Sequence, residues 1–302
     1  MQVAKLASGI KKGDRAALAR GITLAENEPG KAAALLGRFG PPGRTFVLGV
    51  TGPPGTGKSS LVDALIGSFR KKGLKVGVIA VDPTSPLTGG ALLGDRIRMM
   101  SHSADRNVFI RSMASRGWSG GLSRAATQTI RLMDAAGFDM VILETVGIGQ
   151  SDIEVVGVSH AVLVVLMPGL GDDIQVSKAG LMEIGDVYVV NKSDLEGADH
   201  MVVSILSLFR GAKRSPPVLK VSALTGEGVE KLVGAVDAIR GRLESGDQSV
   251  RLKSVRGMIV ETARGAALAR FASVSEKGAD RLAERVLDGD LTVEAAAAKL
   301  SS

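Results

Sequence analysis

The chain has 302 residues, which is enough for one large α/β domain with helical additions or for two domains. It contains no cysteine, which excludes disulfides, thiolate metal sites and cysteine nucleophiles and fits a cytoplasmic protein, and no segment approaches the roughly 20 apolar residues of a membrane span. The formal charge of +7 is spread along the chain and aromatic residues make up only 3%, so the composition argues against a nucleic-acid-binding protein.

The first 36 residues predict helices. Apolar residues recur there at helical spacing between charged ones, and Gly13-Asp14 interrupts the pattern as a break and cap. Residues 37–44 contain Gly40-Pro41-Pro42-Gly43, which is typical of a linker. We therefore expect a helical N-terminal extension over residues 1–40.

The middle of the chain alternates short apolar runs with helical patterns. Such alternation predicts an α/β fold, a mostly parallel sheet covered by helices on both faces, with its ligand at the carboxyl ends of the strands. We assign this domain to residues 41–245. The expected strands lie at 45–51, 76–81, 108–111, 140–144, 161–167, 187–191 and 218–222.

Residues 246–302 carry no strand signal and predict a helical C-terminal arm. An apolar stripe is expected along Val255, Ile259 and Ala263, a break at 288–290, and a last helix capped by Thr292. An apolar stripe indicates that one side of the helix is buried, but it does not identify the element that covers that side. Packing on the chain's own domain and packing on a second subunit therefore both stay open.

A phosphate loop follows the first expected strand. The pattern G-x-x-x-x-G-K-[ST] is met here between a strand and a helix, which is the context that it requires. Backbone N–H groups would contact phosphate oxygens, Lys58 would contact the β- and γ-phosphates, and Ser59 would ligate Mg²⁺. This predicts a P-loop NTPase whose nucleotide is held by Gly52, Pro53, Pro54, Gly55, Thr56, Gly57, Lys58, Ser59 and Ser60.

A guanine-reading motif follows the sixth expected strand. Asn191-Lys192-Ser193-Asp194 fits N-K-x-D, in which the Asp194 carboxylate accepts hydrogen bonds from guanine N1–H and N2–H₂. Adenine cannot offer this pair of donors and would leave the carboxylate without a partner. After the next strand, Ser222, Ala223 and Leu224 would support the base with backbone groups. GTP and GDP are therefore the expected nucleotides.

Three carboxylates are candidates for the metal site beside Ser59. Glu144 ends a buried apolar run, Asp82 ends another, and Asp95 lies in a glycine-rich loop. Gly147 would present a backbone N–H to the γ-phosphate, and Gln150 would orient the attacking water. The candidate catalytic residues are Lys58, Asp95 and Gln150, and the expected Mg²⁺ ligands are Ser59, Asp82, Asp95 and Glu144.

Several further motifs resemble the MeaB/ArgK family of GTPases, the G-protein chaperones of methylmalonyl-CoA mutase and related adenosylcobalamin-dependent mutases. The resemblance covers about residues 10 to 240. Its motifs are Val81-Asp82-Pro83-Thr84-Ser85-Pro86, Thr88-Gly89-Gly90 with Leu93-Gly94-Asp95, Met113-Ala114-Ser115-Arg116-Gly117 with Gly120-Gly121-Leu122, and Glu144-Thr145-Val146-Gly147-Ile148-Gly149-Gln150-Ser151.

The resemblance implies a homodimer with a C-terminal dimerisation arm, Mg²⁺-dependent GTP hydrolysis, and gating of cofactor loading into an acyl-CoA mutase, with a cobalamin adenosyltransferase as a further partner. It also implies a partner-sensitive switch in the loop 169–183, through Lys178. The sequence departs from the family pattern at Ala179, where a second lysine is expected, and at Asp152, where glutamate is usual.

Three other functions are consistent with a phosphate loop. A metal-insertion GTPase for a nickel enzyme needs a metal-loading cluster, but the chain has no cysteine and only three widely spaced histidines. A P-loop kinase would need a base such as Asp95 beside the γ-phosphate, and the N-K-x-D motif argues against ATP as its donor. A nucleotide-dependent scaffold, in which hydrolysis is incidental, is the third.

Overall fold

The computed structural model describes residues 2–43, 45–82, 100–102, 104–114, 119–145, 147, 157–169, 181–212, 215–272 and 276–301. Its centre is a seven-stranded sheet in the order β3-β2-β4-β1-β5-β6-β7, in which every neighbouring pair is parallel. The strands are β1 (Phe46–Thr51), β2 (Val76–Asp82), β3 (Val108–Ala114), β4 (Met140–Glu144), β5 (Ala161–Leu166), β6 (Val187–Val190) and β7 (Val218–Lys220). The predicted α/β fold is confirmed.

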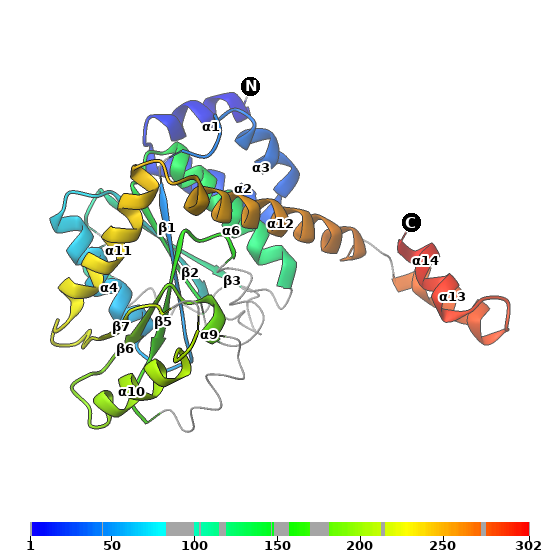
Figure 1. Cartoon of the computed structure of the whole chain (residues 1–302). Coiled ribbons are helices and arrows are strands. Elements are labelled where there is room, and N and C mark those ends of the chain that lie inside the picture. Colours follow the sequence, from blue (N-terminus) through cyan, green and yellow to red (C-terminus); the bar gives the residue numbers. More distant parts are fainter. Residues whose placement is uncertain are drawn as a thin grey trace.

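Helices cover both faces of the sheet (Figure 1). One face packs against α4 (Lys58–Lys71) and α11 (Val229–Glu244). The other packs against α6 (Ser119–Ala135), the N-terminal helices and α10 (Ala198–Leu208). Successive residues of β1 point to opposite faces of the sheet. Leu48 lies on the face covered by α4 and α11, and Val47 lies on the face covered by α6 and the N-terminal helices. The strands are buried on both sides, which explains why they read as continuous apolar runs.

The N-terminal residues form three helices, α1 (Gln2–Lys11), α2 (Arg15–Asn27) and α3 (Pro29–Leu36). The predicted break and cap are confirmed, since Asp14 Oδ1 accepts hydrogen bonds from the N–H groups of Ala16 at 2.8 Å and Ala17 at 3.2 Å. These helices pack on α6, and Arg15 donates to the carbonyl oxygen of Val108 at 2.6 Å. They share one core with the sheet. The division of the chain into an extension and a GTPase domain remains a prediction.

Two short elements, α9 (Leu181–Ile184) and the 3₁₀ turn η1 (Met100–His102), lie in the loops of the sheet region. The strand β3 runs to Ala114, three residues beyond its expected end. The added residues of β3 pair with β2 up to Asp82, so neighbouring-strand pairing extends the strand. At β7 the strand stops at Lys220, because the N–H of Ser222 turns to the carbonyl oxygen of Glu227.

The C-terminal arm consists of α12 (Gln248–Ala272), α13 (Glu276–Leu287) and α14 (Val293–Ser301). The first helix packs along α6 and extends beyond it, and α13 and α14 pack on each other away from the body of the molecule (Figure 1). The predicted cap of the last helix is confirmed, since Thr292 Oγ1 accepts from the N–H of Ala295 at 3.2 Å. None of the helices in the described part of the chain is long and apolar enough to cross a membrane.

The predicted stripe on α12 is not buried against the body of its own chain, and its burial by a second subunit, the alternative left open above, stays a prediction. Ile259 is 65% exposed, whereas Ser254, Met258 and Glu261 face the body. The reason is a close approach at Gly257: a Cβ atom there would lie 1.8 Å from the carbonyl oxygen of Gly157. This contact and the hydrogen bond from Ser254 Oγ to the carbonyl oxygen of Val158, at 2.7 Å, fix the rotation of the helix.

Candidate nucleotide and magnesium site

The phosphate loop connects β1 to α4 at the carboxyl edge of the sheet. Gly52 is required there because its φ is +142° and a Cβ atom would lie 2.0 Å from the carbonyl oxygen of Val165. Lys58 Nζ donates to the carbonyl oxygens of Gly52 at 2.8 Å and Pro53 at 3.1 Å, so the ammonium lies against the loop backbone. The loop therefore combines a positive charge with the N-terminal end of α4, a combination that favours phosphate. Ser60, in the first turn of α4, is exposed.

Ser59 and Glu144, two of the four expected magnesium ligands, contact each other directly. Ser59 Oγ donates a hydrogen bond of 2.6 Å to Glu144 Oε1, and both residues are buried. They are brought together because β4, which ends at Glu144, pairs with β1, whose following loop leads to Ser59. A hydroxyl and a carboxylate are the hard oxygen donors that Mg²⁺ prefers, so this pair fits the ion.

The other expected ligands are less fully defined. Asp82 is the last residue of β2, and Ala80 of that strand pairs with Glu144, so the two strands end side by side. Asp95, Gln150 and Lys178 lie outside the described residues, as do most positions of the motifs around residues 83–95 and 148–151.

Gly147 lies against the phosphate loop, and its contact with the γ-phosphate stays a prediction. Its φ is +86°, and a Cβ atom on it would lie 1.7 Å from the carbonyl oxygen of Gly52 and 2.8 Å from Lys58 Nζ. Two contacts nearby were not expected from the sequence. Thr145 Oγ1 lies 3.1 Å from Thr51 Oγ1, and the Thr145 N–H donates to the carbonyl oxygen of Val50 at 3.0 Å. They hold the segment after β4 to the end of β1.

The residues predicted to read the base lie together at the ends of β6 and β7. Ser222 Oγ donates to Asp194 Oδ1 at 2.6 Å, and this hydrogen bond, helped by a backbone hydrogen bond, lowers the pKa of the Asp194 carboxyl from its usual value. The ionised carboxylate is the form that would accept hydrogen bonds from guanine. The sequence predicted only backbone support from Ser222, so the role of its buried hydroxyl was missed.

Asn191 joins the base-reading segment to the phosphate loop. Its Nδ2 donates to the carbonyl oxygen of Thr56 at 2.7 Å, and its Oδ1 accepts from the N–H of Ala223 at 3.1 Å. The following residue, Lys192, has a φ of +55°, which turns the chain sharply after the strand. Leu224 is 88% exposed beside this segment. The motif that predicts Asn191 does not by itself reveal that it bridges two loops.

This fold and site define a P-loop GTPase. The family model described as methylmalonyl Co-A mutase-associated GTPase MeaB matches residues 18–276. The chain therefore belongs to the MeaB family, as its motifs indicated, and it is an enzyme that hydrolyses GTP.

Relatives agree with this assignment. A putative GTPase of Pyrococcus abyssi is 48% identical over 265 residues, covering 85% of this chain and 81% of the relative. GTPase ArgK of Escherichia coli is 40% identical, covering 82% and 78%. The mitochondrial methylmalonic aciduria type A homolog of Mus musculus is 36% identical, covering 76% and 61%. A crystal structure described as LAO/AO transport system kinase superposes with a TM-score of 0.69 at 29% identity, covering 99% of this chain and 96% of that one.

Proposed function

We propose that this GTPase is a G-protein chaperone that gates the loading of adenosylcobalamin into an acyl-CoA mutase of the methylmalonyl-CoA mutase type and protects the loaded enzyme. The observation that carries the proposal is the match of residues 18–276 to the mutase-associated GTPase family. Family membership favours this function over nickel insertion or phosphoryl transfer to a second substrate. A cobalamin adenosyltransferase is proposed as the source of the cofactor.

The contacts described support the roles proposed for Lys58, Gly147, Asp194, Ser59 and Glu144, whereas those of Asp95 and Gln150 rest on the sequence motifs. Lys58 neutralises charge on the β- and γ-phosphates, Gly147 donates its N–H to the γ-phosphate, and Asp194 reads the guanine. Ser59 and Glu144, with Asp82 and Asp95, would hold a magnesium ion, which would supply further charge neutralisation when bound. Gln150 is the proposed residue for positioning the attacking water.

A homodimer formed through the C-terminal arm is part of the proposal. None of the side chains described between residues 278 and 300 is buried, although α13 and α14 carry apolar residues such as Leu287 and Val293, which are 87% and 66% exposed. Leu252 and Ile259 on α12 are exposed by 64% and 65%. These exposed apolar side chains support an interface along the arm.

Single-turnover GTP hydrolysis, measured with and without the purified cofactor-free mutase, tests the chaperone function. We expect the mutase to bind the GTPase in a nucleotide-dependent way and to change the hydrolysis rate, because a switch protein must interact differently with its partner in its two states. ATP in place of GTP is the control and should support neither effect. If the mutase neither binds nor alters turnover, the chaperone function is wrong, whereas intrinsic GTP hydrolysis would be unaffected.

A further inference from the structure

The N-terminal helices enclose a groove of about 800 Å³ between α1, α2 and the start of α3. Its floor is apolar and is formed by partly buried residues, among them Val3, Leu6 and Leu24. Gly9 in the wall allows α1 to approach α2 closely, since a Cβ atom there would lie 2.8 Å from Ala17 Cβ. Two packed helices with an apolar channel between them form the kind of groove that accepts an apolar segment of another protein.

The rim of the groove is basic. Lys5, Lys12 and Arg20 line it and are exposed, and no hydrogen bond or ion pair of their side chains is found within the described residues. The two carboxylates on the rim are already engaged: Asp14 caps α2, and Glu28 pairs with Lys31. Three positively charged side chains on the rim are therefore available to a binding partner. Their charge favours an acidic partner.

The turn between α13 and α14 has the complementary character. Glu284, Asp288, Asp290 and Glu294 surround it, and in the described part of the chain none of these carboxylates takes part in an ion pair. The most exposed large apolar residues of the arm, Leu287 and Val293, stand among them. We call the segment from Glu284 to Glu294 the acidic tip. It combines exposed apolar side chains with a net negative charge, which the groove matches with an apolar floor and a basic rim.

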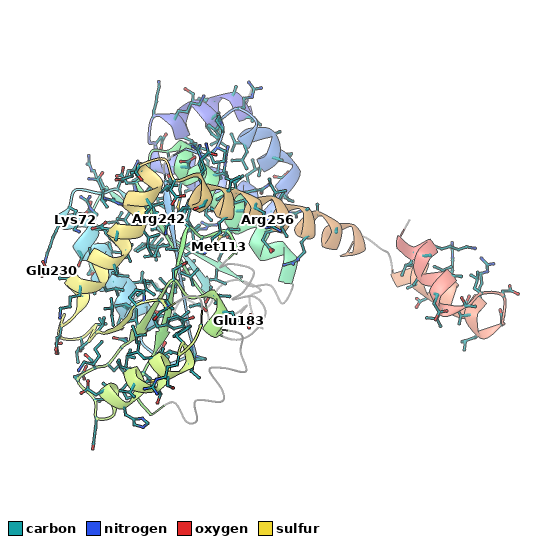
Figure 2. The ribbon with its side chains drawn as sticks, in the orientation of Figure 1. Lys72, Met113, Glu183, Glu230, Arg242 and Arg256 are labelled. Atoms are coloured by element: carbon teal, nitrogen blue, oxygen red, sulfur yellow. The ribbon has the colours of Figure 1, made fainter. Side chains whose placement is uncertain are left out.

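The acidic tip lies far from the groove within one chain. The 25 residues of α12 span about 37 Å at 1.5 Å per residue, and the helix carries α13 and α14 beyond α6 (Figure 1). Figure 2 draws the side chains of the hairpin on all its sides, with no other described element next to it. The tip is therefore placed to contact the groove of a second copy of the chain, and not the groove of its own chain.

We infer that the acidic tip of one protomer binds in the basic groove between α1 and α2 of a second protomer. This inference rests on the homodimer proposed above and names the surface on which the arm docks. A two-fold dimer would form the contact twice, once for each arm, because each copy carries both the tip and the groove. The occupant of the groove is thus a second copy of this chain.

Charge reversal tests the contact by sedimentation equilibrium of the full-length protein. One variant carries Lys12→Glu with Arg20→Glu and has an acidic groove; the other carries Asp288→Lys with Asp290→Lys and has a basic tip. Each alone should raise the dimer dissociation constant at least tenfold, with a loss that shrinks at high salt. An equimolar mixture of the two should dimerise again, because the basic tip then meets the acidic groove and the unchanged tip meets the unchanged groove.

All variants should keep wild-type GDP affinity, which shows that they are folded. The matched control reverses Arg210 and Lys231, two exposed basic residues far from the groove, with Arg210→Glu and Lys231→Glu, and should leave the dimer unchanged. Wild-type dimerisation of both groove and tip variants would overturn the inference while leaving the homodimer intact. A monomeric wild-type protein would overturn both. Failure of the mixture to dimerise would show that the tip and the groove do not meet between protomers and would also overturn the inference.

Discussion

The side-chain amide of Asn191 donates a hydrogen bond of 2.7 Å to the backbone oxygen of Thr56, across 135 positions of sequence. The same side chain accepts from the N–H of Ala223. The base-reading segments after β6 and β7 are therefore fastened to the phosphate loop after β1. A nucleotide that contacts both would bind to a preorganised site, which lowers the cost of ordering the loops on binding.

Replacing Asn191 with alanine should weaken GDP binding by roughly 5- to 150-fold. The change removes two hydrogen bonds inside a buried site, and losses of this kind cost about 1–3 kcal/mol when they leave a buried group without a partner. Isothermal titration calorimetry measures the effect. The control is Leu224→Ala, at an exposed side chain beside the same site, which should bind GDP nearly as tightly as the wild type. Equal affinities of Asn191→Ala and the wild type would show that the bridge is not needed.

Asp194→Asn should shift the preference of the site from guanine to xanthine nucleotides. The amide keeps one acceptor for N1–H but presents a donor in place of the second carboxylate oxygen, so guanine loses the hydrogen bond from N2–H₂, while the C2 carbonyl of xanthine can accept from the amide. Competition between GDP and xanthosine diphosphate measures the change. Wild-type protein that binds ADP as tightly as GDP would contradict the assignment of Asp194.

Ser59→Ala should lower the affinity for GTP in the presence of Mg²⁺ but change it little in EDTA. The hydroxyl is one of the proposed metal ligands, so its removal weakens only the metal-assisted part of binding. Glu144→Gln should behave in the same way, because it removes a negative charge next to the ion. Ser60→Ala is the matched control, since that serine is exposed and adjacent in sequence. A loss of affinity that is equal with and without Mg²⁺ would point to a structural role for Ser59.

Gly257→Ala should destabilise the protein by about 1–3 kcal/mol. The added methyl group overlaps the carbonyl oxygen of Gly157, so α12 must move away from the body. Urea unfolding measures the free energy. Gly241→Ala on α11 is the opposite case, since a Cβ atom there meets no heavy atom within 4 Å, and it should stabilise by up to about 1 kcal/mol. If both changes stabilised the protein equally, α12 would not be held at this contact.

Acid should destabilise the protein partly through His160. Burial, and to a lesser extent the charges of Lys253 and Arg251, lowers its pKa to about 4, and its Nδ1 accepts from the N–H of Val47 at 2.9 Å. The unfolded chain takes up a proton near pH 6.5 and the folded chain only near pH 4. The stabilising contribution is therefore complete above pH 6.5 and is lost as the pH falls from 6.5 to about 4.

At pH 5 this loss amounts to about 2 kcal/mol relative to pH 7.5, from 1.36 kcal/mol for each pKa unit between 6.5 and 5. His160→Asn keeps an acceptor for Val47 but cannot titrate, so its free energy of unfolding should fall less between these two pH values. Parallel losses in the variant and the wild type would assign the acid sensitivity to other groups.

The sequence by itself determined the kind of fold, the order of its elements and the two nucleotide motifs. Apolar runs of strand length and the helical spacing of Leu61, Leu65 and Phe69 are local properties, and burial of those residues follows directly from them. Gly52 to Ser59 and Asn191 to Asp194 could be recognised because each motif is continuous in the chain. The ends of the elements were predicted less accurately. For example, pairing with β2 extends β3 beyond its apolar run.

Only the tertiary structure decided which distant residues meet. The order of the strands depends on packing between elements far apart in sequence, and that order brings Glu144 to Ser59 and Asn191 to Thr56. It also decided which side of α12 is buried, because a glycine contact and a hydroxyl hydrogen bond overrode the apolar pattern at Ile259. Periodicity shows that a helix has an apolar side, whereas the neighbour that covers that side is set by contacts that no local pattern contains.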